Sequence, residues 1–229
     1  MNKFITILIL TVCHVLQAIT TTVIVPCIPE NVHLLPDLVE SYNNQSKLPD
    51  EMIITLSDLC KMDIGYIYEI EECKDLAKFK ILFLVSQKNL SIAEHRNTAC
   101  KYSTGKLLIF NNPDDLPHKQ RIEIIRSFFE LPNVDFLIHK WKGKDDINDF
   151  NKNYRIGHIP YYKIKRSEYQ GLAEVIYDYG NIAFRKPVYE KIKWQQSPKK
   201  DDLRFLQDVG KYGFETILID ANLIKKKKK

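Results

Sequence analysis

Short apolar runs alternate with segments whose apolar residues recur at helical spacing. Five runs rich in β-branched and aliphatic residues predict strands: 22–26, 51–56, 80–85, 106–110 and 134–139. Three segments with apolar residues three and four positions apart predict helices: 34–42, 91–102 and 117–130. This alternation predicts an α/β fold with a mostly parallel sheet flanked by helices, in which ligands bind at the carboxyl ends of the strands.

The second half of the chain has a weaker pattern. Residues 140–179 are rich in tyrosine and show no clear period. Beyond them, 180–184 is expected to be extended, 187–192 a short helical turn, and 203–212 a helix. No internal repeat or linker divides the chain, so we expect one domain over residues 20–224.

Composition is that of a folded domain with a nearly neutral surface. The chain has 229 residues, of which 45% are hydrophobic, so it can bury a substantial core. Its formal charge is +5, but five of the 34 basic residues form the terminal run 225–229. Nucleic acid is therefore not an expected partner, and the lysine run is expected to be a solvated end. A polybasic contact with anionic lipid or nucleic acid is the alternative.

The first eighteen residues resemble a targeting segment. Lys3 precedes an apolar stretch that is too short and interrupted for a clear membrane span. Residues 1–18 are therefore expected to be a signal peptide or signal anchor, which would place the protein in the endoplasmic reticulum or Golgi lumen, or outside the cell, with membrane association through this segment. Asn44 and Asn89 begin glycosylation triplets that matter only there. The alternative is a buried or amphipathic segment of a cytoplasmic protein.

The cysteines lack the paired spacing of a zinc or redox site. They are widely separated and are expected to be buried thiols, unless an oxidising compartment pairs some of them: Cys13, Cys27, Cys60, Cys73 and Cys100.

The first candidate functional residues follow the fourth predicted strand. Asp114 and Asp115 stand there, just ahead of a predicted helix. Two carboxylates at the carboxyl end of a strand suit a hard divalent cation that neutralises a diphosphate. The alternative is that they cap the helix.

Several segments, in order, resemble the family 2 glycosyltransferases of the GT-A fold. The resemblance rests on a first strand at 23–26, an Ala-Arg-Asn-like helix at 92–99, the Thr104-Gly105 turn, a strand leading to an Asp-x-Asp-like motif at 112–114, and a His-x-x-Arg stretch at 118–121. It covers roughly residues 20–220 and implies a transferase that takes a sugar from a uridine or guanosine diphosphate donor. The acceptor hydroxyl, on a carbohydrate, protein or lipid, is not identified.

The resemblance implies a set of donor-binding residues. Those expected to line the nucleotide pocket are Pro26, Glu30, Ser57 and Asp58, with Arg96 beside them. A surface salt bridge is the alternative role for Arg96. His139 and His158 are further candidate metal or phosphate contacts, although a lone histidine is more often structural.

The chain departs from the family at the first acidic position of the motif, where it has Asn112. An amide can hydrogen-bond a ribose hydroxyl but adds no charge to hold a metal. Asp114 is therefore the expected ligand of Mn²⁺ or Mg²⁺, with Asp115 in support, and metal affinity is expected to be reduced.

A late pair of acids resembles the family's catalytic stretch. The resemblance assigns Asp202 as the general base on the acceptor hydroxyl, which implies inversion at the anomeric carbon, and assigns Gly180, Arg185 and Asp201 supporting roles near the acceptor. The alternative for the acids is a helix cap.

Two other functions are alternatives to sugar transfer. A catalytically silent protein that binds nucleotide sugars would have the same fold and the same Asn112. A nucleotidyltransferase would need a glycine-rich basic loop after the first strand, which 27–30 is not.

Overall fold

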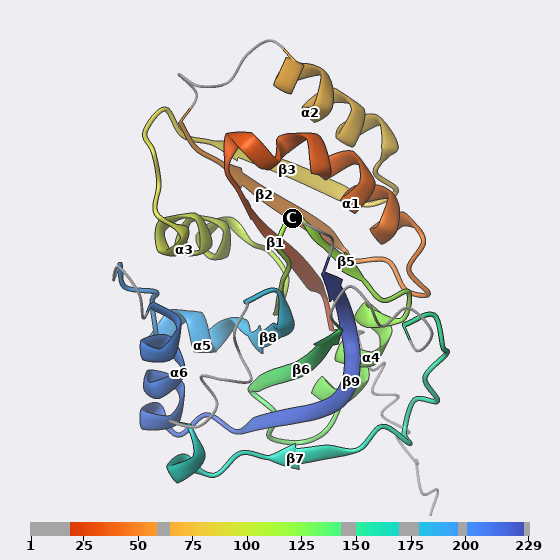
Figure 1. Cartoon of the computed structure of the whole chain (residues 1–229). Coiled ribbons are helices and arrows are strands. Elements are labelled where there is room, and N and C mark those ends of the chain that lie inside the picture. Colours follow the sequence, from red (N-terminus) through yellow and green to blue (C-terminus); the bar gives the residue numbers. More distant parts are fainter. Residues whose placement is uncertain (1–18, 59–64, 143–149, 170–178, 197–200, 227–229) are drawn as a thin grey trace, which may run out of the picture.

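The computed structural model describes residues 19–58, 65–142, 150–169, 179–196 and 201–226 as one sheet with helices on both faces (Figure 1). The strands are β1 (Thr21–Cys27), β2 (Glu51–Leu56), β3 (Lys80–Val85), β4 (Leu107–Phe110), β5 (Asp115–Pro117), β6 (Phe136–Lys142), β7 (Tyr161–Lys163), β8 (Ile182–Arg185) and β9 (Thr216–Lys226). The α-helices are α1 (Leu35–Asn43), α2 (Gly65–Leu76), α3 (Ile92–Tyr102), α4 (Arg121–Phe129), α5 (Lys186–Lys191) and α6 (Asp201–Tyr212). Short 3-10 helices are η1 (Pro29–Leu34), η3 (Arg166–Glu168) and η5 (Tyr179–Asn181).

The strand order is β3-β2-β1-β4-β8-β6-β9-β5, with β7 paired to β9 outside this path. The first four strands of this order are parallel, while β8 runs antiparallel between β4 and β6. Strand β9 is parallel to β6 but antiparallel to β5 and β7. The predicted α/β fold with a mostly parallel sheet flanked by helices is confirmed.

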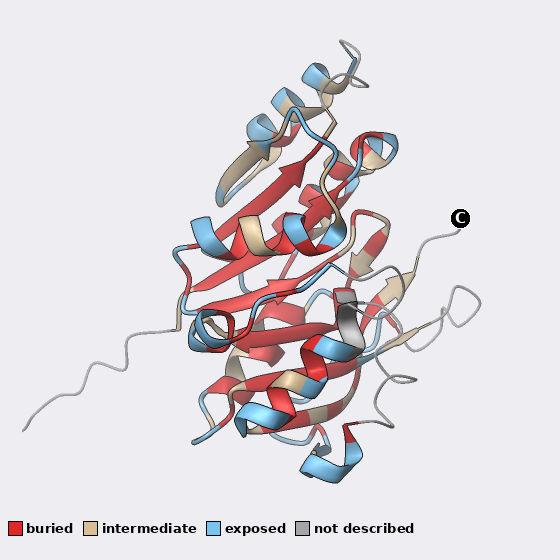
Figure 2. Ribbon diagram, turned by 90° about the vertical axis from the view of Figure 1, so that its left-hand side faces the viewer, coloured by how far each residue is buried: buried red, intermediate tan, exposed pale blue. Residues whose placement is uncertain are grey.

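Each face of the sheet packs against its own group of helices. Helices α1, α2 and α4 cover one face, and α3, α5 and α6 cover the other. Along β1, Val23 and Val25 belong to the first core and Ile24 to the second. The central strands are buried on both sides (Figure 2), which explains why they appear in the sequence as continuous apolar runs.

One α-helix and three strands were not predicted: α2, β5, β7 and β9. Helix α2 has a single fully buried side chain, Cys73, so its pattern gave little apolar signal. Among the described strands, β5 pairs only with β9, and β9 pairs with β5, β6 and β7, so these strands depend on long-range contacts. In consequence α4 begins at Arg121, not near Pro117, and Lys225 and Lys226 are strand residues, whereas the whole lysine run was expected to be a solvated end.

The described cysteines, Cys27, Cys73 and Cys100, are buried free thiols, as expected, while Cys13 and Cys60 lie outside the described residues. Over the described part of the chain, no helix combines the length and apolar character needed to cross a membrane. The targeting segment 1–18 lies outside the described residues.

Candidate active site

Parallel strands bring most of the expected donor-binding residues to one edge of the sheet. Because β1, β2 and β4 run in the same direction, the loops that follow them open on that edge. Pro26 is buried near the end of β1, opposite Thr55 of β2. Ser57 and Asp58 follow β2, and Asn112 follows β4. Glu30 is exposed in η1, just beyond β1.

The loop after β4 folds back on itself through Asn112. Its amide Nδ2 donates to Asp115 Oδ2 at 3.0 Å, and its carbonyl accepts from the Asp115 amide at 3.2 Å. Asp115 is 2% exposed, whereas Asp114 is half-buried. Burial and the neighbouring charge of Asp114 raise the pKa of Asp115 to about 6, against the opposing effect of Lys226. Negative charge is therefore concentrated in this loop.

Asp115 belongs to a strand, so the alternative that the acidic pair caps α4 is wrong. The N-cap of α4 is Gln120, five residues later. Gly180 makes room for the acidic loop, because a β-carbon there would lie 2.8 Å from Asp115 Oδ2 and 3.3 Å from Asn112 Nδ2. Its supporting role is thus steric.

Beneath the loop lies a buried arginine that was not assigned a role from the sequence. Arg121 is fully buried and donates from Nη1 to Tyr42 Oη and to Asn111 Oδ1, both at 2.7 Å. From Nη2 it donates to the Phe110 carbonyl at 2.6 Å and to the Gly180 carbonyl at 2.5 Å. One guanidinium therefore ties the end of β4 to α1 and to η5. The His-x-x-Arg spacing was the sequence signal that could have identified it.

His139 also belongs to this buried network and is not a metal or phosphate contact. It is fully buried; Nε2 lies 3.3 Å from Arg121 Nε and Nδ1 lies 2.8 Å from the Lys140 carbonyl. Burial and the charge of Arg121 hold the pKa of His139 well below its usual range. The imidazole is therefore a neutral acceptor for Arg121, which agrees with the structural role that the sequence favoured over a metal or phosphate contact.

The loop after β2 is supported by another histidine that sequence analysis did not single out. His95 lies 2.9 Å from Thr55 Oγ1 and 3.0 Å from Ser57 Oγ, and it is buried. Burial lowers the pKa of His95 to about 4. Asp58 then adopts a left-handed backbone, with φ of 60°, and donates its amide to the Lys88 carbonyl at 3.1 Å. His95 thus fixes Ser57 in place.

Arg96 follows His95 on α3 and is 4% exposed, so the alternative of a surface salt bridge is wrong. Its guanidinium lies 5.6 Å from the centre of the Trp194 ring. Trp194 stacks on Phe205 of α6 with 4.0 Å between ring centres. This contact holds the first turns of α6 beside α3.

Asp201 and Asp202 are the first two residues of α6, where the sequence predicted them. Their side chains lie outside the described part of the structure. The catalytic role of Asp202 therefore stays a prediction.

The structure separates Arg185 from the other candidates. Arg185 pairs with Leu107, the first residue of β4, whereas Asn112 follows the last. Its guanidinium donates to the backbone carbonyls of Val134 and Phe129. Arg185 therefore stabilises the opposite edge of the sheet, and the acceptor role predicted for it has no geometric support.

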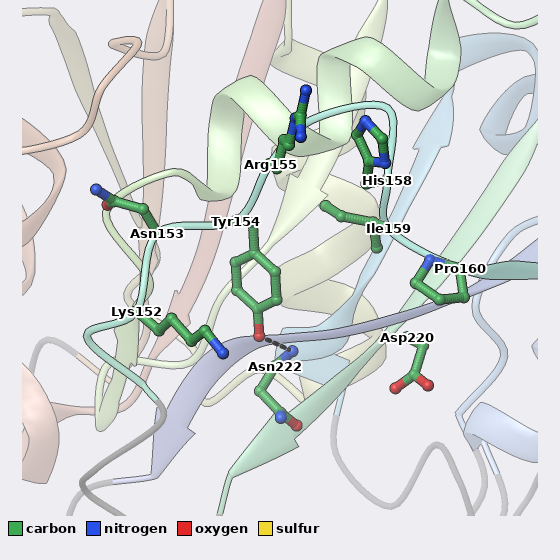
Figure 3. Close-up of a pocket in the computed structure, with 9 residues that line it drawn as sticks. All are labelled: Lys152, Asn153, Tyr154, Arg155, His158, Ile159, Pro160, Asp220 and Asn222. Atoms are coloured by element: carbon green, nitrogen blue, oxygen red, sulfur yellow. Dashed lines mark hydrogen bonds between the residues drawn. The ribbon is translucent and has the colours of Figure 1, made fainter.

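His158 lies apart from the acidic loop, at a hollow of about 420 Å³ (Figure 3). Tyr154 projects across this hollow, and its hydroxyl accepts from the Asn222 amide at 2.9 Å. Asp220, on the same strand as Asn222, forms an ion pair with Lys140 at 2.7 Å. His158 thus has no place in the candidate donor site.

The acidic loop offers oxygen ligands of the kind that hard cations prefer. Asp114 and Asp115 supply carboxylates; burial, and then the adjacent charge of Asp114, raises the pKa of Asp115 to about 6. The described residues contain no cluster of three or more His, Cys, Asp or Glu side chains able to hold a metal. A cation here would therefore need water or phosphate oxygens to complete its shell, which is how Mg²⁺ usually binds.

Solved structures share this fold. Staphylococcus aureus TarS 1-349 in complex with UDP-GlcNAc has a TM-score of 0.68 and 17% identity, over 92% of this chain and 59% of that one. The mannosyltransferase PcManGT from Pyrobaculum calidifontis, in complex with GDP-Man and Mn²⁺, has a TM-score of 0.66 and 15% identity, over 92% of this chain and 57% of that one. The chain thus spans less than two thirds of the length of these two structures.

A search of curated proteins gives no significant match. The model described as "Glycosyl transferase family 2" matches residues 22–193, which is most of the chain and includes every described candidate donor-binding residue. This chain belongs to glycosyl transferase family 2 and has the GT-A fold.

Proposed function

We propose that this protein transfers a sugar from a UDP- or GDP-sugar to an acceptor hydroxyl. The observation that carries the proposal is the acidic loop of Asn112, Asp114 and Asp115, which lies at the sheet edge where parallel strands end. The neighbours TarS and PcManGT, which are solved with UDP-GlcNAc and GDP-Man respectively, support both donor classes.

The donor nucleotide is proposed to lie over the loops after β1 and β2. Pro26, Ser57 and Asp58 would line this side, with Glu30 at its exposed rim. The His95 contacts keep Ser57 in one position, so this part of the site is ordered before the donor arrives. Arg96 lies on the adjacent helix, and its charge would attract the diphosphate.

A divalent cation, Mn²⁺ or Mg²⁺, is proposed to bind at Asp114 with support from Asp115. The carboxylate oxygens of the loop are ligands of the kind that such an ion prefers, and PcManGT is solved with Mn²⁺. When bound, the ion would neutralise charge that develops on the departing diphosphate.

The chemical step is proposed to be a single displacement with inversion. The acceptor oxygen forms a bond to the anomeric carbon as the bond to the diphosphate oxygen breaks, and that oxygen keeps the electron pair. Asp202 takes the acceptor proton, with Asp201 beside it at the start of α6.

The test is release of UDP or GDP from a panel of sugar nucleotides by the full chain, with Mn²⁺ and with EDTA. Water can take the place of the unidentified acceptor as the attacking oxygen, so the assay measures release of the nucleotide without that acceptor. Asp202→Asn is expected to lower the rate by about 100-fold or more. Asp208→Asn, on the same helix, is the matched control and is expected to leave the rate within about twofold.

Asn112 favours a second candidate, a silent protein that binds sugar nucleotides without turnover. Replacing an acidic side chain by an amide removes charge where the family holds its metal. Saturable binding of a sugar nucleotide, with no release of its nucleotide above the rate of Asp202→Asn, would support this function and count against transfer.

A further inference from the structure

The last residue of β9 lies at the acidic loop. In the antiparallel pair of β5 and β9, Lys226 stands directly opposite Asp115. Residues directly opposite each other in such a pair project to the same face of the sheet. The Lys226 ammonium also lies 5.1 Å from the centre of the Trp141 ring. Lys226 is therefore positioned by a strand on one side and an aromatic ring on the other.

The preceding lysine, Lys225, projects to the other face of the strand. Lys225 stands opposite Leu116, and successive side chains of a strand project to opposite faces. The two lysines have the same charge, the same half-buried class and adjacent positions. They form a matched pair, of which Lys226 alone shares a face with Asp115.

Two features of the charge distribution combine at this point. Asn112 supplies no negative charge at the first position of the Asp-x-Asp-like motif 112–114, and Lys226 supplies a positive charge opposite Asp115, the residue that follows the motif. Both features weaken the attraction of the loop for a metal ion and strengthen its attraction for a diphosphate. A lysine ammonium carries three hydrogen-bond donors, so it can join a carboxylate to a phosphate oxygen as a divalent cation would.

We propose that Lys226 binds the diphosphate of the donor directly and links it to Asp115, so that donor binding persists without a divalent cation. The inference rests on the proposed function and adds a protein cation to it. Trp141 limits the positions open to the ammonium, which lowers the entropic cost of holding the phosphate.

The experiment is titration calorimetry of the full chain with UDP and with GDP, each in EDTA and in Mn²⁺. Wild-type protein is expected to bind one of the two nucleotides in EDTA. Lys226→Gln is expected to lower that affinity about tenfold or more, because a charge-assisted hydrogen bond is lost. Lys225→Gln is expected to bind as wild type does, and Lys226→Arg to retain most of the affinity. Thermal melting of each variant checks that the fold is intact.

Each other outcome has a definite meaning. Binding that requires Mn²⁺ and is unchanged in Lys226→Gln would overturn this inference and leave the proposed function standing. An equal loss in Lys225→Gln would also overturn it, because the lysines would then act only through net charge. Failure of wild-type protein to bind either nucleotide, with or without Mn²⁺, would refute the proposed function itself and this inference with it.

Discussion

At the scale of single residues, the candidate site depends on buried polar groups that do not touch solvent. Among the described residues, Arg121 is the largest fully buried side chain, and it connects β4, α1 and η5 by charge-assisted hydrogen bonds. A buried charge is tolerated only when such bonds replace its hydration. Here they hold the backbone that leads into the acidic loop.

Arg121→Met is therefore expected to destabilise the fold by about 3–5 kcal/mol, because carbonyl and hydroxyl acceptors lose a buried donor. Urea unfolding of wild type and variant measures the change. Arg126→Met is the matched control: Arg126 is on the same helix, with a mostly buried side chain that forms an ion pair with Asp50, which is itself about half-exposed. It is expected to cost about 1 kcal/mol or less. Equal losses in the two variants would contradict the importance given to the Arg121 network.

At the scale of elements, α3 brings together the groups that support the nucleotide side of the site. His95, Arg96 and Asn97 lie on successive positions of its second turn, and they contact Ser57, the Trp194 ring and the Trp194 backbone respectively. The helix begins with a capping box, in which Ser91 Oγ accepts from the Glu94 amide and Glu94 Oε2 accepts from the Ser91 amide. The capping box therefore stabilises the N-terminus of α3 at Ser91.

Ser91→Ala is expected to lower the free energy of unfolding by about 1 kcal/mol, because it removes the N-cap acceptor. Ser41→Ala is the control, since the Ser41 hydroxyl donates to the Leu38 carbonyl within α1 and caps no helix; a change below about 0.5 kcal/mol is expected. Urea unfolding compares the two. A similar loss in both would show that the cap contributes nothing specific.

At the scale of the whole molecule, neutral buried histidines couple folding to pH. The pKa of His95 is lowered to about 4 by burial, below the ordinary value of 6.5. As pH falls below 6.5, His95 takes up a proton in the unfolded chain but stays neutral in the folded chain. Its contribution to the free energy of unfolding is therefore complete above pH 6.5 and is lost as pH falls toward 4. His139 acts in the same direction.

Wild-type protein is accordingly expected to lose stability between pH 7 and pH 5. His95→Gln is expected to lose about 2 kcal/mol less over that interval, because one of the linked protonations is gone. Urea unfolding at both pH values gives the difference. His33→Gln is the control, since His33 is exposed; its pH dependence should match that of wild type.

The sequence by itself determined the fold class and most of the first half of the chain. Continuous apolar runs such as 107–110 are typical of strands buried on both faces, and the structure has β4 at those residues. It also indicated that the residues after β1, β2 and β4 would share one edge, because parallel strands end together. Local pattern and capping chemistry suffice for such elements.

The tertiary structure alone decided which of the remaining residues belong to the site. Arg185 appeared to match a motif, yet antiparallel pairing of β8 with β4 carries it to the far edge. Lys226 appeared to be part of a solvated tail, yet pairing of β9 with β5 places it opposite Asp115. The direction and register of these strands arise from contacts between residues about 80 to 110 positions apart. A local pattern of apolar residues does not predict such contacts.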